Sequence, residues 1–397
     1  MLLTTDKKNK ILKDLAVLIE TSRDEIIAQN KKDIENAHNI DDTLLDRLKV
    51  DDKKVSGMVA AVEEVIGLDD PQGKVLNTYN HPNGIKVENK VVPFGRILII
   101  YESRPDVTIE AAISAFKAGN KILLKGGKEA LHSNLILTDL WKRALKANSV
   151  PEDYVEYLSI NREETQKLLT DNTHHVDLII PRGGEGLINY IKQSTSVPVI
   201  VSGRGNNFIY VHNDADFEMA IDLVLNGKSR LSVCNAIDKV LFNKDIPNLS
   251  KGMDSLLGKL AKTGIEVYGD GAYFSDFSSV KKVENAQMYG EEFLAAKIMF
   301  GLVDTLEDGI KCINKYSGGH SAVIVSSDAT VADQFQQEVD CAAVYHNASS
   351  RFTDGGQFGF GAEIAISTQK LHFRGPVGLG QLVTNKWFIS GNGQIRD

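Results

Sequence analysis

One cysteine carries the strongest chemical signal in the sequence. Cys234 lies in the run LSVCNA (231–236), directly after a polar break at residues 226–230. We expect a helix to begin at or near Cys234. A helix N-terminus and nearby cations both favour the thiolate, which is the form of cysteine that attacks a carbonyl in covalent catalysis. Cys234 is therefore a candidate nucleophile; the alternative interpretation is a buried structural cysteine.

The remaining cysteines and the most conspicuous histidine favour structural roles. Cys312 lies at a predicted helical position and Cys341 precedes a predicted strand, so core packing is the better interpretation for both. His320, just before another strand, is interpreted as a structural histidine rather than a catalytic base. Three cysteines outside any CxxC or Cys/His pattern indicate a reducing compartment and no metal site.

Glycine-bearing turns that follow predicted strands could cradle a phosphate. The turn Lys125-Gly126-Gly127 is basic and permits close approach of the backbone to an anion. Lys125 at a strand end favours NADP over NAD, because a basic residue accommodates the additional phosphate of NADP. The alternative is a solvated lysine at a strand exit.

A second such turn is Arg182-Gly183-Gly184, which could face a phosphate or be a plain connection from strand to helix. The run at 203–205 lacks the third glycine of GxGxxG, so the usual dinucleotide fingerprint is absent. The net charge of −8 means that an anionic substrate would need cations gathered locally. Arginines near turns are the candidates, although each alone is more often a surface residue: Arg104, Arg182, Arg230 and Arg351.

The elements that must position these residues alternate between strands and helices. A length of 397 residues allows two or three folding units, and alternation indicates open parallel α/β sheets. Ligands at such sheets lie at the carboxyl ends of the strands, where residues 102–104, 125–127 and 182–184 fall. The predicted strands are 96–101, 121–125, 176–180, 197–201, 208–212, 239–242, 297–303, 322–326 and 342–346. The predicted helices include 6–36, a segment from Pro105 to Gly119, 129–147, 214–225, 247–262, 304–316 and 328–338.

Two extended runs at 75–92 flank an Asn-Gly pair (83–84) and predict a β-hairpin. An isolated hairpin is marginal in water, so we expect this one to need a partner.

Together these motifs resemble the gamma-glutamyl phosphate reductase family of the aldehyde dehydrogenase superfamily. The resemblance rests on separated stretches from about residue 85 to the C-terminus. They are IIYESRPDVTIEAAISAFKAGNKILLKGG, IPRGGEGLI, SVCNAIDKVLF, GGHSAVIVS, NASSRFTDGGQFGFGAEIAISTQKLHFRGPVGLG and TNKWFISGNGQIR.

The resemblance implies an aldehyde dehydrogenase-like α/β fold with two open α/β domains and a β-hairpin oligomerisation element. An NADPH-binding domain would comprise residues 1–73 and 94–226, and a catalytic domain carrying Cys234 would comprise 227–373. Residues 74–93 and 374–397 would form the oligomerisation element and join a neighbouring subunit's sheet in a homodimer or homotetramer. The family's cofactor domain lacks GxGxxG, which accounts for the missing fingerprint.

The implied reaction is the NADPH-dependent reduction of glutamyl 5-phosphate to glutamate 5-semialdehyde through a Cys234 thioester, in proline biosynthesis. Candidate donors for the developing oxyanion are the Cys234 backbone N–H and the side chain of Ser103 or Asn235. Gln357 stands where the family more often has a glutamate, a residue type that helps hold the cofactor ribose in related dehydrogenases.

Hydrolytic relatives carry a water-activating glutamate in a segment that resembles residues 201–205 here, where no carboxylate occurs. Its absence protects a thioester from water, and Arg204 in that segment would suit an anionic group. The expected partners are the small-molecule substrate and, as an open question, the upstream glutamate kinase.

Bulk properties limit the alternatives. The negative charge argues against nucleic-acid and membrane-surface binding, and the N-terminal sequence contains no signal peptide or apolar span, so a cytoplasmic location is expected. The nearest rival function is another thiol-dependent acyl reductase, such as one acting on an acyl-CoA. Two further alternatives are a catalytically silent nucleotide-binding module and a structural assembly protein. The structural assembly protein would leave Cys234 without a role.

Overall fold

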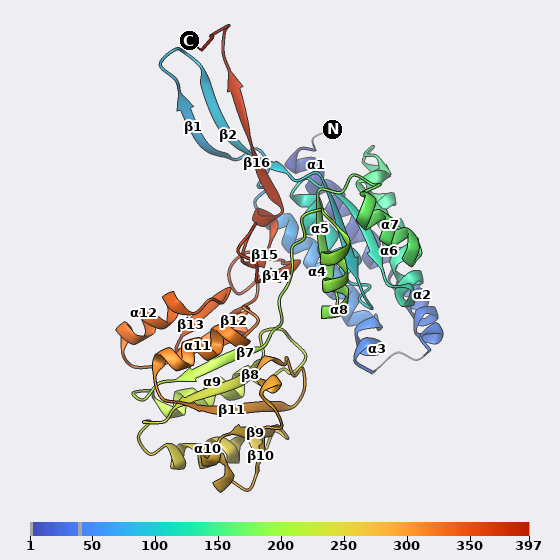
Figure 1. Ribbon diagram of the computed structural model, residues 1–397. Helices are drawn as coiled ribbons and strands as arrows, with labels where there is room; N and C mark the ends of the chain where they lie inside the picture. Colours follow the sequence, from blue (N-terminus) through green and yellow to red (C-terminus); the bar gives the residue numbers. More distant parts are fainter. Residues whose placement is uncertain (1–2, 39–41, 397) are drawn as a thin grey trace. The chain divides into compact units, whose positions relative to one another are not determined.

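The computed structural model describes residues 3–38 and 42–396, and the chain is divided into two compact units (Figure 1). The predicted ranges 1–73 and 374–397 include residues 1–2, 39–41 and 397, which lie outside the described residues. The first unit comprises residues 1–201, 359–365 and 377–397, and the second comprises 202–358 and 366–376. The first division falls after residue 201, whereas the sequence placed it after 226. The reason is that β7 (Asn207–Val211) pairs with β8 (Ile237–Asn243) in the sheet of the second unit.

A parallel sheet forms the centre of the first unit. Its strands are β3 (Arg96–Tyr101), β4 (Lys121–Gly126), β5 (Val155–Tyr157) and β6 (Leu178–Arg182), in the order β5-β4-β3-β6. Three of the predicted strands are thereby confirmed. The chain leaves β3 towards β4 on one side and returns to β6 on the other, which makes the carboxyl end between β3 and β6 a topological switch point.

The predicted strand at 197–201 is wrong. That segment makes only an isolated parallel bridge, between Val199 and Ile179 of β6. Pro198 has no N–H to donate to a ladder, although its carbonyl accepts a hydrogen bond from Ile179.

Helices α1 (Thr5–Thr21) and α2 (Arg23–Asn36) replace the single helix predicted over 6–36, because the chain breaks at Ser22. Ser22 caps α1 by donating its backbone N–H to Leu18. Helices α3 (Asp42–Leu48), α4 (Asp52–Gly67) and α7 (Arg162–Asp171) were not predicted. The other helices of this unit are α5 (Val107–Lys117), α6 (Leu131–Ala147) and α8 (Glu185–Ser194).

An antiparallel three-stranded sheet reaches away from the rest of the first unit, drawn in blue and red in Figure 1. The predicted hairpin forms strands β1 (Val75–Asn80) and β2 (Lys86–Pro93), and Gly84 in its turn has a φ of +93°. The C-terminal strand β16 (Val383–Ser390) pairs along the whole of β2. The partner that the hairpin needs is therefore first of all a strand of its own chain.

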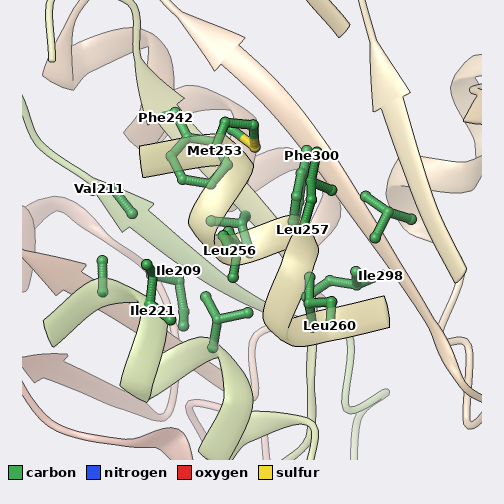
Figure 2. Packing of buried hydrophobic residues seen from close by; sticks show 14 of the residues in the cluster. Ile209, Val211, Ile221, Phe242, Met253, Leu256, Leu257, Leu260, Ile298 and Phe300 are labelled. Carbon is green, nitrogen blue, oxygen red and sulfur yellow. The ribbon is translucent and has the colours of Figure 1, made fainter. Parts of the chain in front are cut away.

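The second unit is built on a parallel sheet in the order β10-β9-β11-β8-β7-β12-β13. Its core packs α9 (Phe217–Gly227) and α10 (Leu249–Ala261) against the sheet. Figure 2 shows this cluster, in which Leu256 and Leu260 of α10 meet Ile209, Ile298 and other strand residues. Each such buried aliphatic side chain contributes about 2 kcal/mol through removal of apolar surface from water.

The predicted second α/β series is confirmed in order and type. Its further elements are β9 (Glu266–Asp270), β10 (Val280–Lys282), β11 (Lys297–Val303), α11 (Leu306–Tyr316), β12 (Ser321–Val325), α12 (Ala329–Glu338) and β13 (Ala343–His346). A short sheet of β14 (Ala365–Ser367) and β15 (Gly375–Val377) lies where the chain changes unit. Within the described ranges, no helix is long and apolar enough to cross a membrane.

Candidate active site

Cys234 is exposed and lies in a turn that leads into β8. The predicted helix start is wrong: the chain passes from Cys234 into a strand three residues later, and the preceding helix α9 has already ended at Gly227. The cysteine therefore lies at the amino ends of the parallel strands of its unit. A helix dipole therefore does not act on this thiol, and any stabilisation of its thiolate form would come from nearby side chains.

The backbone of Cys234 is fixed from below by Asn207, a fully buried residue at the start of β7. Its amide nitrogen donates to the carbonyl oxygens of Cys234 and Ala236, at 2.7 Å each, and to that of Gly205 at 3.0 Å. Its oxygen accepts from the backbone N–H of Ser321 at 3.0 Å. One side chain thus ties the Cys234 turn to two neighbouring segments, the start of β7 and the start of β12, which holds the turn in one conformation.

Arg351 is coupled electrostatically to Cys234. Burial, and then the like charge of Arg230, lower the pKa of Arg351, whereas negative charge on Cys234 raises it. The interaction is mutual, so the Arg351 cation favours a thiolate at position 234. The structure therefore places Arg351 within electrostatic reach of two other predicted site residues, Cys234 and Arg230.

Asn235, the neighbour of the nucleophile, is a buried residue with its amide group already engaged. Its nitrogen donates to the carbonyl oxygens of Arg351, at 3.2 Å, and Thr353, at 3.1 Å. Its oxygen accepts a short hydrogen bond from the Arg351 guanidinium, and its backbone carbonyl accepts from Ser350 at 2.7 Å. Asn235 thus aims Arg351 rather than presenting a donor to a substrate.

The other two thiols are poor nucleophiles. Burial raises the pKa of Cys312 to about 11 and that of Cys341 to about 11. Both pack against the same apolar cluster of the second unit. At neutral pH they remain protonated, and Cys234 alone of the three is exposed.

A pocket of about 580 Å³ opens in the second unit, and Arg351, which contacts Asn235, lies on its wall. Gln357 lies on the same wall, so a predicted substrate residue and a predicted cofactor residue line the same pocket. Arg204 does not line this pocket, and its guanidinium donates to the carbonyl oxygen of Gly290 at 3.0 Å.

In the first unit the three predicted motifs meet at one edge of the sheet. The register aligns Tyr101, the last residue of β3, with Gly126 of β4 and Arg182 of β6. Residues 102–104, 126–127 and 183–184 consequently leave the sheet side by side at the switch point. This confirms the expected convergence of the three turns.

Ser103 is held by a carboxylate that the sequence analysis did not assign. Its backbone N–H and its hydroxyl both donate to the same oxygen of Glu129, at 2.7 and 2.9 Å. Ser103 is buried and has a φ of +42°, a conformation that this pair of hydrogen bonds fixes. Its hydroxyl is therefore committed within its own unit.

A second carboxylate occupies the Arg182-Gly183-Gly184 turn. The backbone N–H of Gly184, at the N-cap of α8, donates to Glu102 at 3.1 Å. A Cβ at Gly183 would collide with the same carboxylate oxygen, so a larger residue there would displace the Glu102 side chain. The helix N-terminus thus already has an anion, supplied by the chain itself.

Lys125 donates to the carbonyl oxygen of Gly126 at 2.9 Å, and burial lowers the pKa of its ammonium. A pocket of about 790 Å³ adjoins this turn, with Gly127 and Lys128 on its wall. Lys128, rather than Lys125, is the lysine that faces the pocket. Arg104 lies near enough to Glu110 to lower that carboxyl's pKa, although burial raises it more.

The predicted residues therefore fall into two sets. The first unit carries Ser103, Arg104, the Lys125-Gly126-Gly127 turn and the Arg182-Gly183-Gly184 turn. The second unit carries Cys234, Asn235, Arg204, Arg230, Arg351 and Gln357. Sequence reasoning missed Glu102, Glu129 and Asn207. Glu102 directly follows an apolar strand and Asn207 begins one, which was the available signal for these two; Glu129 lies in a short helical turn after β4.

The chain matches known proteins over its whole length. The sequence model of the Aldehyde dehydrogenase family matches residues 2–264. A gamma-glutamyl phosphate reductase of Clostridium botulinum is 41% identical over 396 residues, which cover 99% of this chain and 95% of the relative.

Solved structures give the same result. The crystal structure of a gamma-glutamyl phosphate reductase from Thermotoga maritima superposes with a TM-score of 0.94 at 40% identity, covering 100% of this chain and 95% of the other. An acetylating aldehyde dehydrogenase from Geobacillus thermoglucosidasius superposes with a TM-score of 0.70 at 16% identity, covering 100% and 94%. The second likeness concerns the fold alone.

Proposed function

We propose that this chain, which belongs to the gamma-glutamyl phosphate reductases of the aldehyde dehydrogenase family, reduces glutamyl 5-phosphate to glutamate 5-semialdehyde and releases phosphate. It is an oxidoreductase that uses a nicotinamide cofactor, as the family does. The reaction belongs to proline biosynthesis. The observation that carries the proposal is the exposed thiol of Cys234, whose backbone is fixed by Asn207 and which is coupled electrostatically to the Arg351 cation.

The first chemical step assigns a role to each of these groups. The Cys234 thiolate attacks the acyl carbonyl; a carbon–sulfur bond forms, the carbon–oxygen bond to phosphate breaks, and phosphate leaves with the electron pair. The Arg351 cation stabilises the thiolate before attack, and we assign Arg230 to the phosphate dianion as it departs. The product on the protein is a thioester at Cys234.

The nicotinamide cofactor supplies a hydride, which is the reducing equivalent that converts the acyl group into an aldehyde. The protein must stabilise negative charge on the carbonyl oxygen, and the predicted donors Ser103 and Asn235 already donate elsewhere. We therefore assign oxyanion stabilisation to the backbone N–H of Cys234, and we assign Asn235 as the residue that positions Arg351.

The thioester must outlast competing attack by water. Residues 201–205 contain no carboxylate that could serve as a general base. Gly205 packs directly against the backbone of Cys234, and the Arg204 side chain contacts Gly290. The segment therefore packs closely against the backbone of the nucleophile. We assign Arg204 the role of holding this segment in place.

NADPH is the proposed form of the cofactor. The pocket beside Gly127 has the size of a nucleotide site, and Lys128 supplies a cation to it. Three carboxylates also line the pocket: Asp33, Glu102 and Glu129. All three accept from N–H groups of the chain, which offsets their charge and leaves Lys128 available for a phosphate. The turns at 125–127 and 182–184 bring backbone to the cofactor, and Arg104, predicted to bind the substrate, follows β3 at the same edge of the sheet.

We also propose assembly into a homodimer or homotetramer through the sheet β1-β2-β16. The register places Tyr79, Val87 and Ile389 in one row across this sheet, with Trp387 on the same face. Tyr79, Trp387 and Ile389 are each more than half exposed. A second copy of the chain is the occupant that this apolar face fits, because it offers the same face in return.

The proposed location is the cytoplasm, which suits three cysteines that form no disulfide within the described chain. Contact with the glutamate kinase that makes the substrate is a further proposal, supported only by the instability expected of an acyl phosphate in water.

The test runs the reaction backwards, from glutamate 5-semialdehyde, phosphate and NADP. Phosphate-dependent formation of NADPH is expected; dependence on coenzyme A instead would identify the rival acyl-CoA reductase. Cys234→Ala should abolish turnover while NADPH binding persists, and Cys312→Ser serves as the matched control with a buried thiol. Retained turnover in Cys234→Ala would remove the covalent mechanism.

A further inference from the structure

The pocket in the second unit has features that the proposed chemistry at Cys234 does not use. Its wall combines the C-terminal end of α9 with the segment that follows β13. Asn226 and Ser229 come from the first element, and Ser349 and Arg351 come from the second. The volume of about 580 Å³ suits a small molecule, and Arg351 joins it to the nucleophile through Asn235.

The pocket is unusual in its charge. The chain has 53 acidic side chains against 45 basic ones, yet the described residues on this wall include no carboxylate and one cation, Arg351. The remaining polar groups are amides and hydroxyls. A wall of this composition recognises a polar ligand with an anionic end rather than a cation alone.

Two amide groups on the wall have unused donors. The side chain of Gln357 makes no hydrogen bond within the described chain, and Asn226 uses only its oxygen, which accepts from Ser349 at 2.6 Å. Ser229 donates to the backbone carbonyl of Asn226 at 2.7 Å. The amide nitrogens of Asn226 and Gln357 are therefore available to a ligand, next to the Arg351 guanidinium.

The carbonyl groups at the C-terminal end of α9 are already engaged on this wall. The carbonyl oxygens of Val224 and Leu225 accept from the Lys228 N–H, and that of Asn226 accepts from Lys228 and Ser229. The pocket therefore offers a guanidinium and amide donors, which fit an anionic group.

We propose that this pocket binds the amino-acid end of the substrate, that is, an α-carboxylate and an α-ammonium on one carbon. The inference rests on the proposed function, because it takes the reacting carbonyl to lie at Cys234. Arg351 and the amide nitrogens of Asn226 and Gln357 hold the carboxylate. Gln357 thereby belongs to the substrate site, whereas the sequence had assigned it to the cofactor.

The pocket explains a choice among substrates. A substrate that lacks the charged end leaves the Arg351 cation and two amides unpaired, which costs binding free energy in every turnover. The enzyme should therefore discriminate strongly against simple aldehydes of the same length. Discrimination on this basis resides in KM and kcat/KM for the aldehyde, because the groups concerned lie away from the bond that breaks.

The experiment compares two aldehydes in the phosphate-dependent reverse reaction: glutamate 5-semialdehyde, and butanal, which lacks both charged groups. The variants are Asn226→Ala and Gln357→Ala. Asp222→Ala is the matched control, since Asp222 is exposed on the same helix and does not line the pocket. Each pocket variant should raise KM for the semialdehyde about tenfold, the equivalent of one lost hydrogen bond to a charged group. The ratio of kcat/KM between the two aldehydes should fall by the same factor, with KM for NADP and for phosphate unchanged.

The possible failures separate cleanly. An inactive wild-type enzyme on semialdehyde and phosphate defeats the proposed function itself. An active wild type with an unchanged aldehyde ratio in both variants overturns the pocket assignment alone. A raised KM for NADP in Gln357→Ala returns that residue to the cofactor, and a raised KM for phosphate in Asn226→Ala assigns the pocket to phosphate; either result also overturns the inference.

Discussion

Gly205 lies directly against the backbone of Cys234, so that a methyl group at position 205 would sit 2.6 Å from the Cys234 Cα and carbonyl carbon and closer still to its oxygen. Real Cβ atoms do not approach backbone so closely, and the Cys234 turn would have to move. The side-chain amide nitrogen of Asn207 donates to the carbonyl oxygens of both residues, which limits how far they can separate.

Gly205→Ala is therefore expected to reduce kcat/KM on the order of 100-fold, because a shift of about 1 Å at a nucleophile has effects of that size. Steady-state kinetics of the phosphate-dependent reverse reaction provide the measurement. Gly258→Ala, in a helix of the same unit with open space around its Cα, is the control and should retain activity. Normal activity in Gly205→Ala would show that the turn tolerates displacement.

The carboxylate of Glu102 provides a second test, at the turn proposed to face the cofactor. It accepts from the Gly184 N–H and adds negative charge where a pyrophosphate would lie. Glu102→Gln keeps an acceptor oxygen and removes the charge. The dissociation constant of NADPH, measured by calorimetry, should fall two- to fivefold, equivalent to about 0.5–1 kcal/mol for relief of a partly exposed like charge.

The exposed Glu63 supplies the control for that experiment, since Glu63→Gln makes the same change in net charge away from this edge. An equal decrease in the dissociation constant of NADPH in both variants would show that net charge, rather than the position of Glu102, causes the effect. Weaker binding in Glu102→Gln would mean that the carboxylate organises the turn for the cofactor rather than opposing it.

What the sequence could predict was local. Apolar runs and their spacing identified the strands around Ile99, Leu123 and Ile324, because such patterns depend on neighbours along the chain. The convergence of three turns at one edge followed from a general rule for parallel sheets. The hairpin followed from an Asn-Gly pair, which has few other uses.

What the sequence could not predict was set by contacts between distant segments. Cys234 lies at the amino ends of its strands, opposite to the edge that the rule for open sheets indicates, and only the strand order shows this. The hydrogen bonds of Glu129 with Ser103, and of Asn207 with Cys234, join residues 26 and 27 positions apart. Hydrogen bonds of this kind between distant residues produce no periodic pattern in a single sequence.

The apolar row on the β1-β2-β16 sheet predicts an effect on assembly. Ile389→Asp places a charge in the row formed with Tyr79 and Val87 and should convert the oligomer to monomers in multi-angle light scattering. Ser390→Asp puts the same charge on the opposite face of the same strand and should leave the oligomer intact. An unchanged mass in Ile389→Asp would contradict assembly through this face.

A buried histidine predicts how stability depends on pH. Burial lowers the pKa of His320 to about 4, its Nδ1 lies 2.8 Å from the Ser321 hydroxyl, and its Nε2 has no hydrogen-bond partner in the described part of the chain. The folded state therefore keeps this ring neutral, whereas the unfolded chain protonates it near pH 6.5. Between these values the unfolded state binds more protons, so stability falls as the pH falls.

The loss attributable to His320 reaches about 3 kcal/mol between pH 6.5 and pH 4, because each unit of pKa difference is worth 1.36 kcal/mol. Thermal unfolding of wild type and His320→Leu across this range isolates the contribution. The difference in melting temperature should move steadily in favour of the variant as the pH is lowered, and it should be constant above pH 7. A difference that does not change with pH would mean that the ring is protonated equally in both states, and would place a proton acceptor near Nε2 of the native protein.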